Sequence, residues 1–291
     1  GAERVGLDDD FFALGGNSLI ATRLAARLGQ ALDAQVPVRV LFENSTVEGL
    51  AVVVQKTAGS GARMELEARE RPERLPLSLA QQRMWLVNQM DPGSAAYNIP
   101  LALRLTGNLD VAALRQALHD VLVRHESLRT SYPSDIEGPV QKIVAIDELL
   151  SPLETIQVDD EAAAFNRVVE LVTTGFDVAQ EVPVRTGLLE LGPADFIFVL
   201  VAHHIAADGE SMGPLARDMM VAYEARVRGT APSWTPLTVQ YADFAIWQRE
   251  VLGSAGEVGS QAARQLDFWR RTLDGVSSTP GLPSDRQRPA Q

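Results

Sequence analysis

The 291-residue chain contains 46% hydrophobic residues, enough to build the core of one large domain or two smaller ones. Its formal net charge of −12 opposes binding to nucleic acid or to an anionic membrane, and no apolar run reaches the length of a membrane span, so we expect neither partner and a cytoplasmic location. The absence of cysteine excludes disulfide bonds, thiolate metal sites and a cysteine nucleophile, so thioester chemistry would need sulfur from a prosthetic group or a partner.

The first predicted elements form a small helical module. A glycine turn at 15–16 precedes a helix that begins at Ser18, where Asn17 or Ser18 itself can cap the free backbone amides. A short apolar piece at 38–42 and a second helix over 45–54 follow. We therefore expect an all-α unit of about 55 residues, a size that buries proportionately little surface by itself.

A second, longer unit is predicted over 75–291. Residues 58–74 separate it from the first unit, residues 1–57; they are rich in glycine, small and charged residues and lack a sustained apolar face, which is typical of a linker. Strands are predicted at 99–105, 128–132, 140–146, 184–191 and 196–202. Helices are predicted at 110–122, 161–173, 211–227, 241–250 and 259–273. This alternation indicates an α/β unit.

The strand predicted at 196–202 is continuously apolar, which indicates burial on both of its faces. It leads directly into His203 and His204, with Asp208 close behind. From the residue types alone, the pair could form a metal site, a structural pair, or a base with its orienting group. Neighbouring strand residues point to opposite faces, so a shared metal is the least favoured of the three, and one histidine is expected to face a cavity.

Ser18 also has two physical readings. Helix N-terminal amides stabilise an attached phosphate, and glycines without Cβ atoms let another enzyme come close, so a modification site is possible there. Serine is equally a preferred helix cap, and helix physics alone favours that reading.

The segment "DDDFFALGGNSLIATRLAARL" resembles the attachment segment of peptidyl carrier proteins in nonribosomal peptide synthetases. The family pattern D-x-F-F-x-x-G-G-x-S-L/I is matched at Asp9, Phe11, Phe12, Gly15, Gly16, Ser18 and Leu19. The resemblance implies that a phosphopantetheinyl transferase attaches 4′-phosphopantetheine to Ser18 and that the thiol of this arm carries an amino acid or peptide. The arm would supply the sulfur that the chain lacks.

The same resemblance assigns roles to the apolar residues of the helical module. Phe11 and Phe12 would pack the loop onto the bundle, and Leu19 and the segment 41–42 would form a surface for partner proteins. Ordinary core positions are an equally good reading of Phe11, Phe12 and Leu41. The family bundle has four helices, whereas this segment is expected to begin after the first one.

Four further segments resemble, in order, the motifs of condensation domains, which form peptide bonds in the same synthetases. They are "SLAQQRMW" at 78–85, "RHESLRTSY" at 124–132, "AHHIAADGES" at 202–211 and "YADFAIW" at 241–247. The resemblance implies an α/β fold like that of chloramphenicol acetyltransferase. It also implies acyl transfer to an amine, with adenylation domains and a downstream carrier protein as partners and aminoacyl or peptidyl thioesters as substrates.

The motif H-H-x-x-x-D-G carries the roles that the condensation family implies. His204 would be catalytic, either as general base or as the group that orients the amine or stabilises the tetrahedral intermediate, and His203 would be structural. Gly209 would let the backbone approach the reacting groups and point an N–H at the oxyanion. Asp208 would hold the loop through a salt bridge, with Arg124 or Arg129 as its partner.

Other residues of the motifs receive lesser roles. Ser78, Arg83 and Trp85 are expected to be architectural, His125 is expected to support the fold, and His119 is expected to have no part in the chemistry. No metal site is expected.

The intact H-H-x-x-x-D-G argues against the heterocyclising branch of the family and leaves the epimerising relatives open. The first two motifs look most like the branch that joins an L-configured donor to an L-acceptor. The products would be of the antibiotic or siderophore type. Full condensation domains have two lobes, and the motifs here correspond to the amino-terminal one, so we expect little activity from this segment alone. The alternatives are a carrier joined to a lobe that only binds partners, and a free-standing acyltransferase, which the adjacent carrier segment disfavours.

Overall fold

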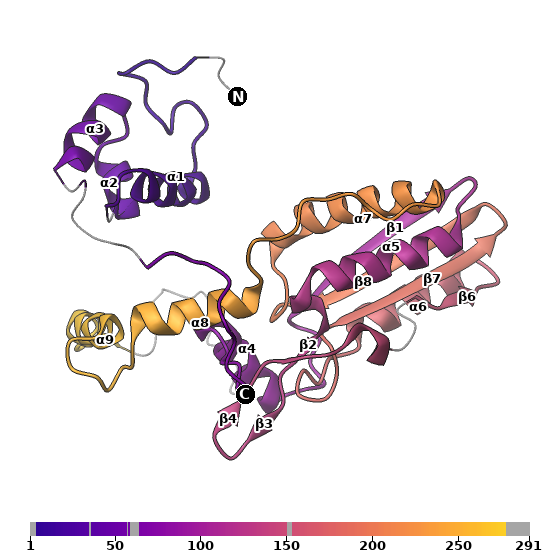
Figure 1. Ribbon diagram of the computed structural model, residues 1–291. Coiled ribbons are helices and arrows are strands. Elements are labelled where there is room, and N and C mark those ends of the chain that lie inside the picture. The colour runs from indigo at the N-terminus through magenta and orange to yellow at the C-terminus, as the bar shows by residue number, and fades with distance from the viewer. Residues whose placement is uncertain (1–3, 35, 57, 59–63, 150–152, 278–291) are drawn as a thin grey trace, which may run out of the picture. The chain divides into compact units, whose positions relative to one another are not determined.

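The computed structural model describes residues 4–34, 36–56, 58, 64–149 and 153–277. The chain divides into two compact units, residues 1–65 and 66–291, which are described separately (Figure 1). In the described part of the chain, no helix is long and apolar enough to cross a membrane.

The first unit is helical, with α1 (Ser18–Ala31), α2 (Val38–Glu43) and α3 (Val47–Gln55). The piece predicted at 38–42 is therefore a short helix. Ala21, Ala25 and Leu41 form the buried centre, against which the side chains of Phe11 and Phe12 pack. This small core accounts for the apolar residues before and after the glycine turn.

Asp10 ties the loop before α1 to the start of α3. Its carboxylate accepts hydrogen bonds from the backbone N–H groups of Phe12 (2.8 Å) and Ala13 (2.9 Å) and from the hydroxyl of Ser45. The Ser45 hydroxyl, followed by the backbone N–H of Ala13, lowers the pKa of this carboxyl group. These bonds fix the segment that leads to Ser18.

The second unit is built on a four-stranded sheet. Its strands, in the order β1 (Asn98–Thr106), β8 (Asp195–His203), β7 (Val184–Gly192) and β6 (Thr155–Gln157), pair antiparallel except for β6 and β7, which are parallel. The α/β prediction is confirmed. The short strand β6 was not predicted from the sequence.

Helices cover both faces of this sheet (Figure 1). The helix α5 (Val111–Arg124) packs beside α7 (Met212–Val227) on one face, and α6 (Glu161–Thr173) lies on the other. Three more helices complete the unit: α4 (Leu79–Met90), α8 (Tyr241–Leu252) and α9 (Gln261–Thr272). All but α4 agree closely with the predicted helices.

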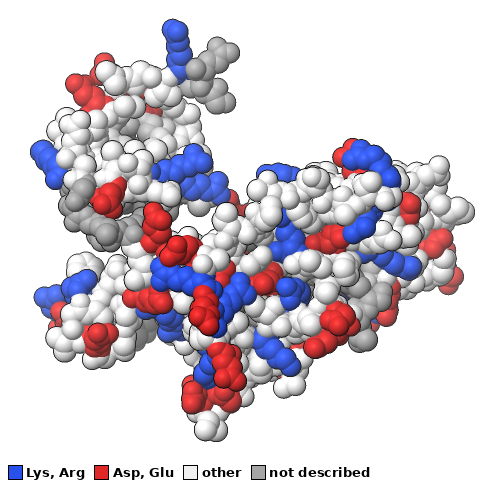
Figure 2. Space-filling view, viewed as in Figure 1, with Lys and Arg blue, Asp and Glu red and all other residues white. Residues whose placement is uncertain are grey.

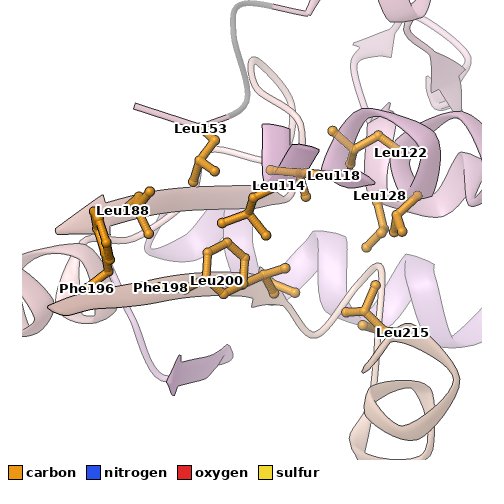
Figure 3. Packing of buried hydrophobic residues seen from close by; sticks show 13 residues of the cluster. Leu114, Leu118, Leu122, Leu128, Leu153, Leu188, Phe196, Phe198, Leu200 and Leu215 are labelled. Carbon is orange, nitrogen blue, oxygen red and sulfur yellow. The ribbon is translucent and has the colours of Figure 1, made fainter. Parts of the chain in front are cut away.

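The central strand β8 is buried on both faces, as its continuous apolar sequence predicts. Phe196, Phe198 and Leu200 join the core under α5 and α7, where Figure 3 shows Leu114 and Leu118 of α5 pointing toward them. The alternate residues, among them Val199 and Val201, join the core on the side of α6. Close packing on both faces holds β8 in place, so the position of the residues at its end is well defined.

Two predicted strands are much shorter than expected. Residues 126–129 form a 3₁₀ helix, η1 (Glu126–Arg129), and only β2 (Thr130–Ser131) and β5 (Lys142–Ile143) pair there. A second small ribbon pairs β3 (Ser134–Asp135) with β4 (Gly138–Pro139). The remaining short helices are η2 (Ile146–Glu148) and η3 (Gly209–Ser211).

Candidate functional site

The two adjacent histidines lie in opposite environments at the end of β8. The His203 side chain is only 1% exposed, and its Nδ1 accepts a hydrogen bond of 3.1 Å from the backbone N–H of Ile205. Burial, with a smaller contribution from His204, lowers the pKa of His203 to about 4, so the imidazole is neutral at physiological pH. This geometry fits the structural role expected of His203.

His204 is the first residue beyond the strand and has an exposed side chain. Its backbone N–H donates to the carbonyl oxygen of Tyr97 (2.9 Å), while the N–H of Ala206 donates to that of His203 (3.0 Å). The chain therefore turns immediately after β8. This turn directs the second imidazole away from the sheet and into a cavity.

That cavity has a volume of about 630 Å³ and lies wholly within the second unit. His204 and Asp208 line it from the loop after β8, Arg83 from α4, and His125 from the loop before η1. Tyr241, the first residue of α8, also lines the cavity. All four motif segments, 78–85, 124–132, 202–211 and 241–247, thus contribute residues to the wall of this cavity.

Asp208 holds the loop by capping η3 rather than by an ion pair. One of its oxygens accepts from the backbone N–H (2.9 Å) and the hydroxyl (2.6 Å) of Ser211, and its own N–H donates to that hydroxyl (3.0 Å). The Ser211 hydroxyl is the main cause of a lowered pKa at Asp208. The carboxylate is therefore charged and anchored close to His204.

The expected salt bridge from Asp208 to Arg124 or Arg129 is wrong. Arg124 instead donates to Asp218 of α7 (2.8 Å) and to a backbone carbonyl, and the same carboxylate oxygen lies 2.7 Å from His125 Nε2. Arg129 donates to the carbonyl oxygens of two residues, 3.1 Å and 2.7 Å away. The sequence does not reveal Asp218 as the partner of Arg124, because the two residues are far apart in the chain and meet only where α7 packs on α5.

Gly209 does not need to be glycine for steric reasons within the described residues. A Cβ atom built there would meet no atom within 4 Å, and its backbone φ is not positive. The role suggested for its backbone N–H remains a prediction.

Helix α4 positions the first motif. Ser78 is buried and caps the helix in a reciprocal pair with Gln81, and the indole N–H of Trp85 donates to the carbonyl oxygen of Tyr132 (2.9 Å). These contacts agree with the architectural roles expected for Ser78 and Trp85. Arg83 differs, because it is exposed and lines the cavity of His204. Helical spacing of the motif would have placed Arg83 on the face of Ala80 and Met84.

In the first unit, Ser18 is the first residue of α1 and is exposed. Asn17 caps the helix, because its side-chain oxygen accepts from the N–H groups of Leu19 (3.1 Å) and Ile20 (3.0 Å). The Ser18 hydroxyl is thus not used for capping. An exposed hydroxyl beside two glycines fits the attachment of a phosphopantetheine arm.

The two glycines before Ser18 have different reasons to be there. Gly15 has a φ of +93°, a conformation that side chains rarely adopt. A Cβ atom on Gly16 would lie 2.4 Å from the ring of Phe11 and 2.5 Å from its carbonyl oxygen, so the loop can fold back onto Phe11 only with glycine. Of the expected docking residues, Leu19 and Phe42 are exposed, whereas Leu41 is 1% exposed and belongs to the core.

Neither unit offers a metal site among its described residues, where no group of three or more histidine, aspartate or glutamate side chains is suitably placed.

Comparison with known proteins gives two family matches. The family model of the condensation domain matches residues 72–291, and that of the phosphopantetheine attachment site matches residues 1–53. Together these matches cover nearly the whole chain.

The curated relatives are much longer than this chain. It is 45% identical over 287 residues to a probable non-canonical nonribosomal peptide synthetase, CymA, of Salinispora arenicola, covering 99% of this chain and 4% of that protein. It is 42% identical over 291 residues to a dimodular nonribosomal peptide synthase of Bacillus subtilis, covering all of this chain and 12% of that one.

Among solved structures, the X-domain from teicoplanin biosynthesis, solved in complex with OxyB, superposes with a TM-score of 0.71 and 39% identity. The match covers 79% of this chain and 50% of that one. Two family models in tandem, relatives of the same kind along the full length and a matching fold agree with each other. The chain belongs to the condensation-domain family of nonribosomal peptide synthetases, and a phosphopantetheine attachment segment precedes its condensation segment.

Proposed function

We propose that Ser18 carries 4′-phosphopantetheine and that the cavity around His204 is the place where a carrier-bound thioester reacts with an amine. The observation that carries the proposal is the contrast between the two histidines. His203 is buried, neutral and hydrogen-bonded, while His204 is exposed and lines a cavity of about 630 Å³. Domain boundaries at 1–57, 58–74 and 75–291 belong to the same proposal.

The arm supplies a thiol that holds the acyl group as a thioester. His204 accepts a hydrogen bond from the attacking amine, and this bond aligns the lone pair of the amine nitrogen. His204 then takes the amine proton as the C–N bond forms. Asp208 lies in the loop that follows and keeps η3 capped, so the segment from His204 to Ser211 holds its shape. His203 fixes the start of that segment from beneath.

The partners follow from this role. A phosphopantetheinyl transferase loads Ser18, an adenylation domain supplies the amino acid, and a downstream carrier protein presents the acceptor amine. The reaction class is amide formation between an L-configured donor and an L-acceptor, in the synthesis of a peptide of the antibiotic or siderophore type within the cytoplasm.

Intact mass spectrometry tests the carrier assignment. Incubation with a phosphopantetheinyl transferase and coenzyme A is expected to add one phosphopantetheine to the chain and none to the Ser18→Ala variant. Thr22→Ala, which removes a neighbouring hydroxyl of α1, is the matched control and is expected to load fully. Loading of Ser18→Ala would refute the assignment.

The amide-forming role is tested in the synthetase that contains these residues. His204→Ala is expected to lower the rate of dipeptide formation by about a hundredfold or more, because both alignment and proton transfer are lost. His119→Ala, an exposed histidine of α5 outside the cavity, is the control and should retain full activity. Equal rates for His204→Ala and the parent would overturn the proposal.

A second candidate function is a lobe that binds another enzyme. It is favoured by the neighbour at 39% identity, an X-domain solved in complex with OxyB. The two candidates separate cleanly, because a binding lobe would tolerate His204→Ala without loss of partner affinity or product.

A further inference from the structure

Arg83 places a guanidinium-bearing side chain on the wall of the cavity that holds His204. Helix α4 turns one face toward this cavity, and Ala80, Arg83 and Met84 line it at the spacing of one helical turn. The capping box at Ser78 and the indole bond of Trp85 hold α4 in place on either side of Arg83. The position of this arginine is therefore fixed, although its own head group is exposed.

Arg83 also stands out among the arginines of its unit. Within the described part of residues 66–277, the arginines other than Arg83, Arg217 and Arg270 take part in a hydrogen bond or ion pair. Of these three, Arg83 alone lines the cavity around His204. It holds a charge at the candidate site that no structural contact in the described residues uses.

The remaining charges of the cavity wall are acidic and come from a different element. Asp208 and Glu210 lie on the segment that follows His204 and belong to η3 or its cap. The wall thus carries negative charge beside the imidazole and positive charge on α4. An ammonium group entering the cavity is attracted to the first region, and a carbonyl oxygen that gains negative charge is attracted to the second.

We infer that Arg83 binds the carbonyl oxygen of the donor thioester and neutralises the negative charge that develops there during amine attack. The inference rests on the proposed function. As the amine nitrogen bonds to the carbonyl carbon, the π electron pair of C=O moves onto oxygen, where the guanidinium donates hydrogen bonds. The proton of the amine passes to His204. When C=O re-forms, the C–S bond breaks and the leaving thiolate takes the proton from His204.

Kinetics in the synthetase that contains these residues test the inference. Arg83→Gln is expected to lower kcat for dipeptide formation by about a hundredfold, the loss typical of removing one oxyanion donor, with KM for the loaded carrier changed less than about twofold. Arg83→Lys is expected to recover part of kcat, since it keeps the charge but not the forked geometry. Arg270→Gln, which removes another unpaired arginine far along the chain on α9, is the matched control and should leave both constants unchanged.

Equilibrium binding gives a readout that does not depend on turnover. Two pantetheine-linked probes are compared by calorimetry: a phosphonate, which mimics the charged tetrahedral carbon, and a neutral methyl ketone. Arg83→Gln is expected to weaken phosphonate binding about tenfold or more and ketone binding less than about twofold. Circular dichroism melting of each variant checks that α4 remains folded.

The possible outcomes separate the inference from the proposed function. Unchanged kcat and phosphonate affinity in Arg83→Gln, with dipeptide formation lost in His204→Ala, would overturn the inference and leave the proposed function standing. A loss confined to KM that disappears at high salt would also overturn it, because it would indicate contact with the phosphate of the arm. Full activity of His204→Ala would overturn the proposed function itself.

Discussion

Two identical side chains, adjacent in the sequence, acquire different chemistry because a strand ends between them. His203 still belongs to β8 and is buried near the aromatic rings of Tyr97 and Phe176, each with its ring centre 6.2 Å away. His204 lies past the last strand pair and reaches the cavity. The alternation of side chains along a strand predicts this split, and the structure shows which member is buried.

The buried imidazole predicts a pH dependence of stability. The pKa of His203 is lowered from 6.5 to about 4, so between these values the unfolded chain binds a proton that the folded chain excludes. The free energy of unfolding is therefore highest, as far as His203 determines it, above pH 6.5. It declines by about 3 kcal/mol in total as the pH falls to 4. Urea unfolding at several pH values measures the decline.

His203→Gln should unfold with a shallower pH dependence over this range, since glutamine does not titrate. His119→Gln removes an exposed histidine and should keep the slope of the parent. The same slope in parent and His203→Gln would show that burial of this imidazole does not govern the effect.

Asp208 shows where residue-scale reasoning from the sequence fails. The arginines of the segment 124–132 suggest a salt bridge to Asp208, yet one oxygen of Asp208 accepts two hydrogen bonds from Ser211, three residues away. Arg124 instead donates a hydrogen bond to the carboxylate of Asp218 on α7. Local hydrogen bonds form at almost no entropic cost, whereas long-range pairing depends on helix packing that one sequence does not reveal.

At the scale of elements, the cap of α4 combines two tasks. The Ser78 hydroxyl accepts from the N–H of Gln81 (3.1 Å) and lies 3.1 Å from the hydroxyl of Tyr241, which is on the cavity wall. The side-chain oxygen of Gln81 accepts from the N–H of Ser78 (3.0 Å) in return. A single buried serine therefore starts α4 and connects it to α8.

Ser78→Ala is expected to lower the free energy of unfolding by about 1 to 2 kcal/mol, because a buried cap is lost and Gln81 keeps only half of its pair. Ser260→Ala removes the cap of α9, a helix without buried residues, and is the matched control with an expected loss of about 0.5 to 1 kcal/mol. Chemical denaturation compares the two. A larger loss at Ser260 would contradict the importance of the buried network.

The elements differ in how well the sequence predicts them. The strand β8 and the helix α6 follow almost residue for residue from hydrophobic pattern and capping. Helix α4 was missed, because "LAQQRMWLVNQM" mixes amides with apolar residues and carries only a weak amphipathic signal. The strands expected at 128–132 and 140–146 shrink to a two-residue ladder, because η1 uses the first of these segments for a helical turn.

At the scale of the whole molecule, both units contain charged side chains at the surface and a buried hydrophobic cluster. On the face shown in Figure 2, acidic and basic side chains are interspersed, so the net charge of −12 does not collect there in a single patch. Each unit has its own buried cluster, as the compositional break at 58–74 suggests. The first unit has one buried cluster, built around three buried residues, whereas the second unit has two larger clusters.

The cavity of His204 sets an expectation for activity at this scale. The match to the X-domain structure covers 50% of that chain, and we expect a second lobe to contribute to the site. Because misplacement by about 1 Å can cost about a hundredfold in rate, we expect the 291-residue chain to form dipeptide at about one hundredth of the rate of the complete synthetase or less. Single-turnover assays with loaded carriers measure both rates. Equal rates would show that these residues hold a complete site.

The cap of α1 has a consequence for how the carrier matures. Asn17 satisfies the first amides of the helix, so the neighbouring hydroxyl can be esterified without unwinding a single turn. We therefore expect a transferase to act on the already folded carrier, with α1 retained after loading. Loading is then expected to change what the carrier bears and to leave the surface that its partners recognise the same.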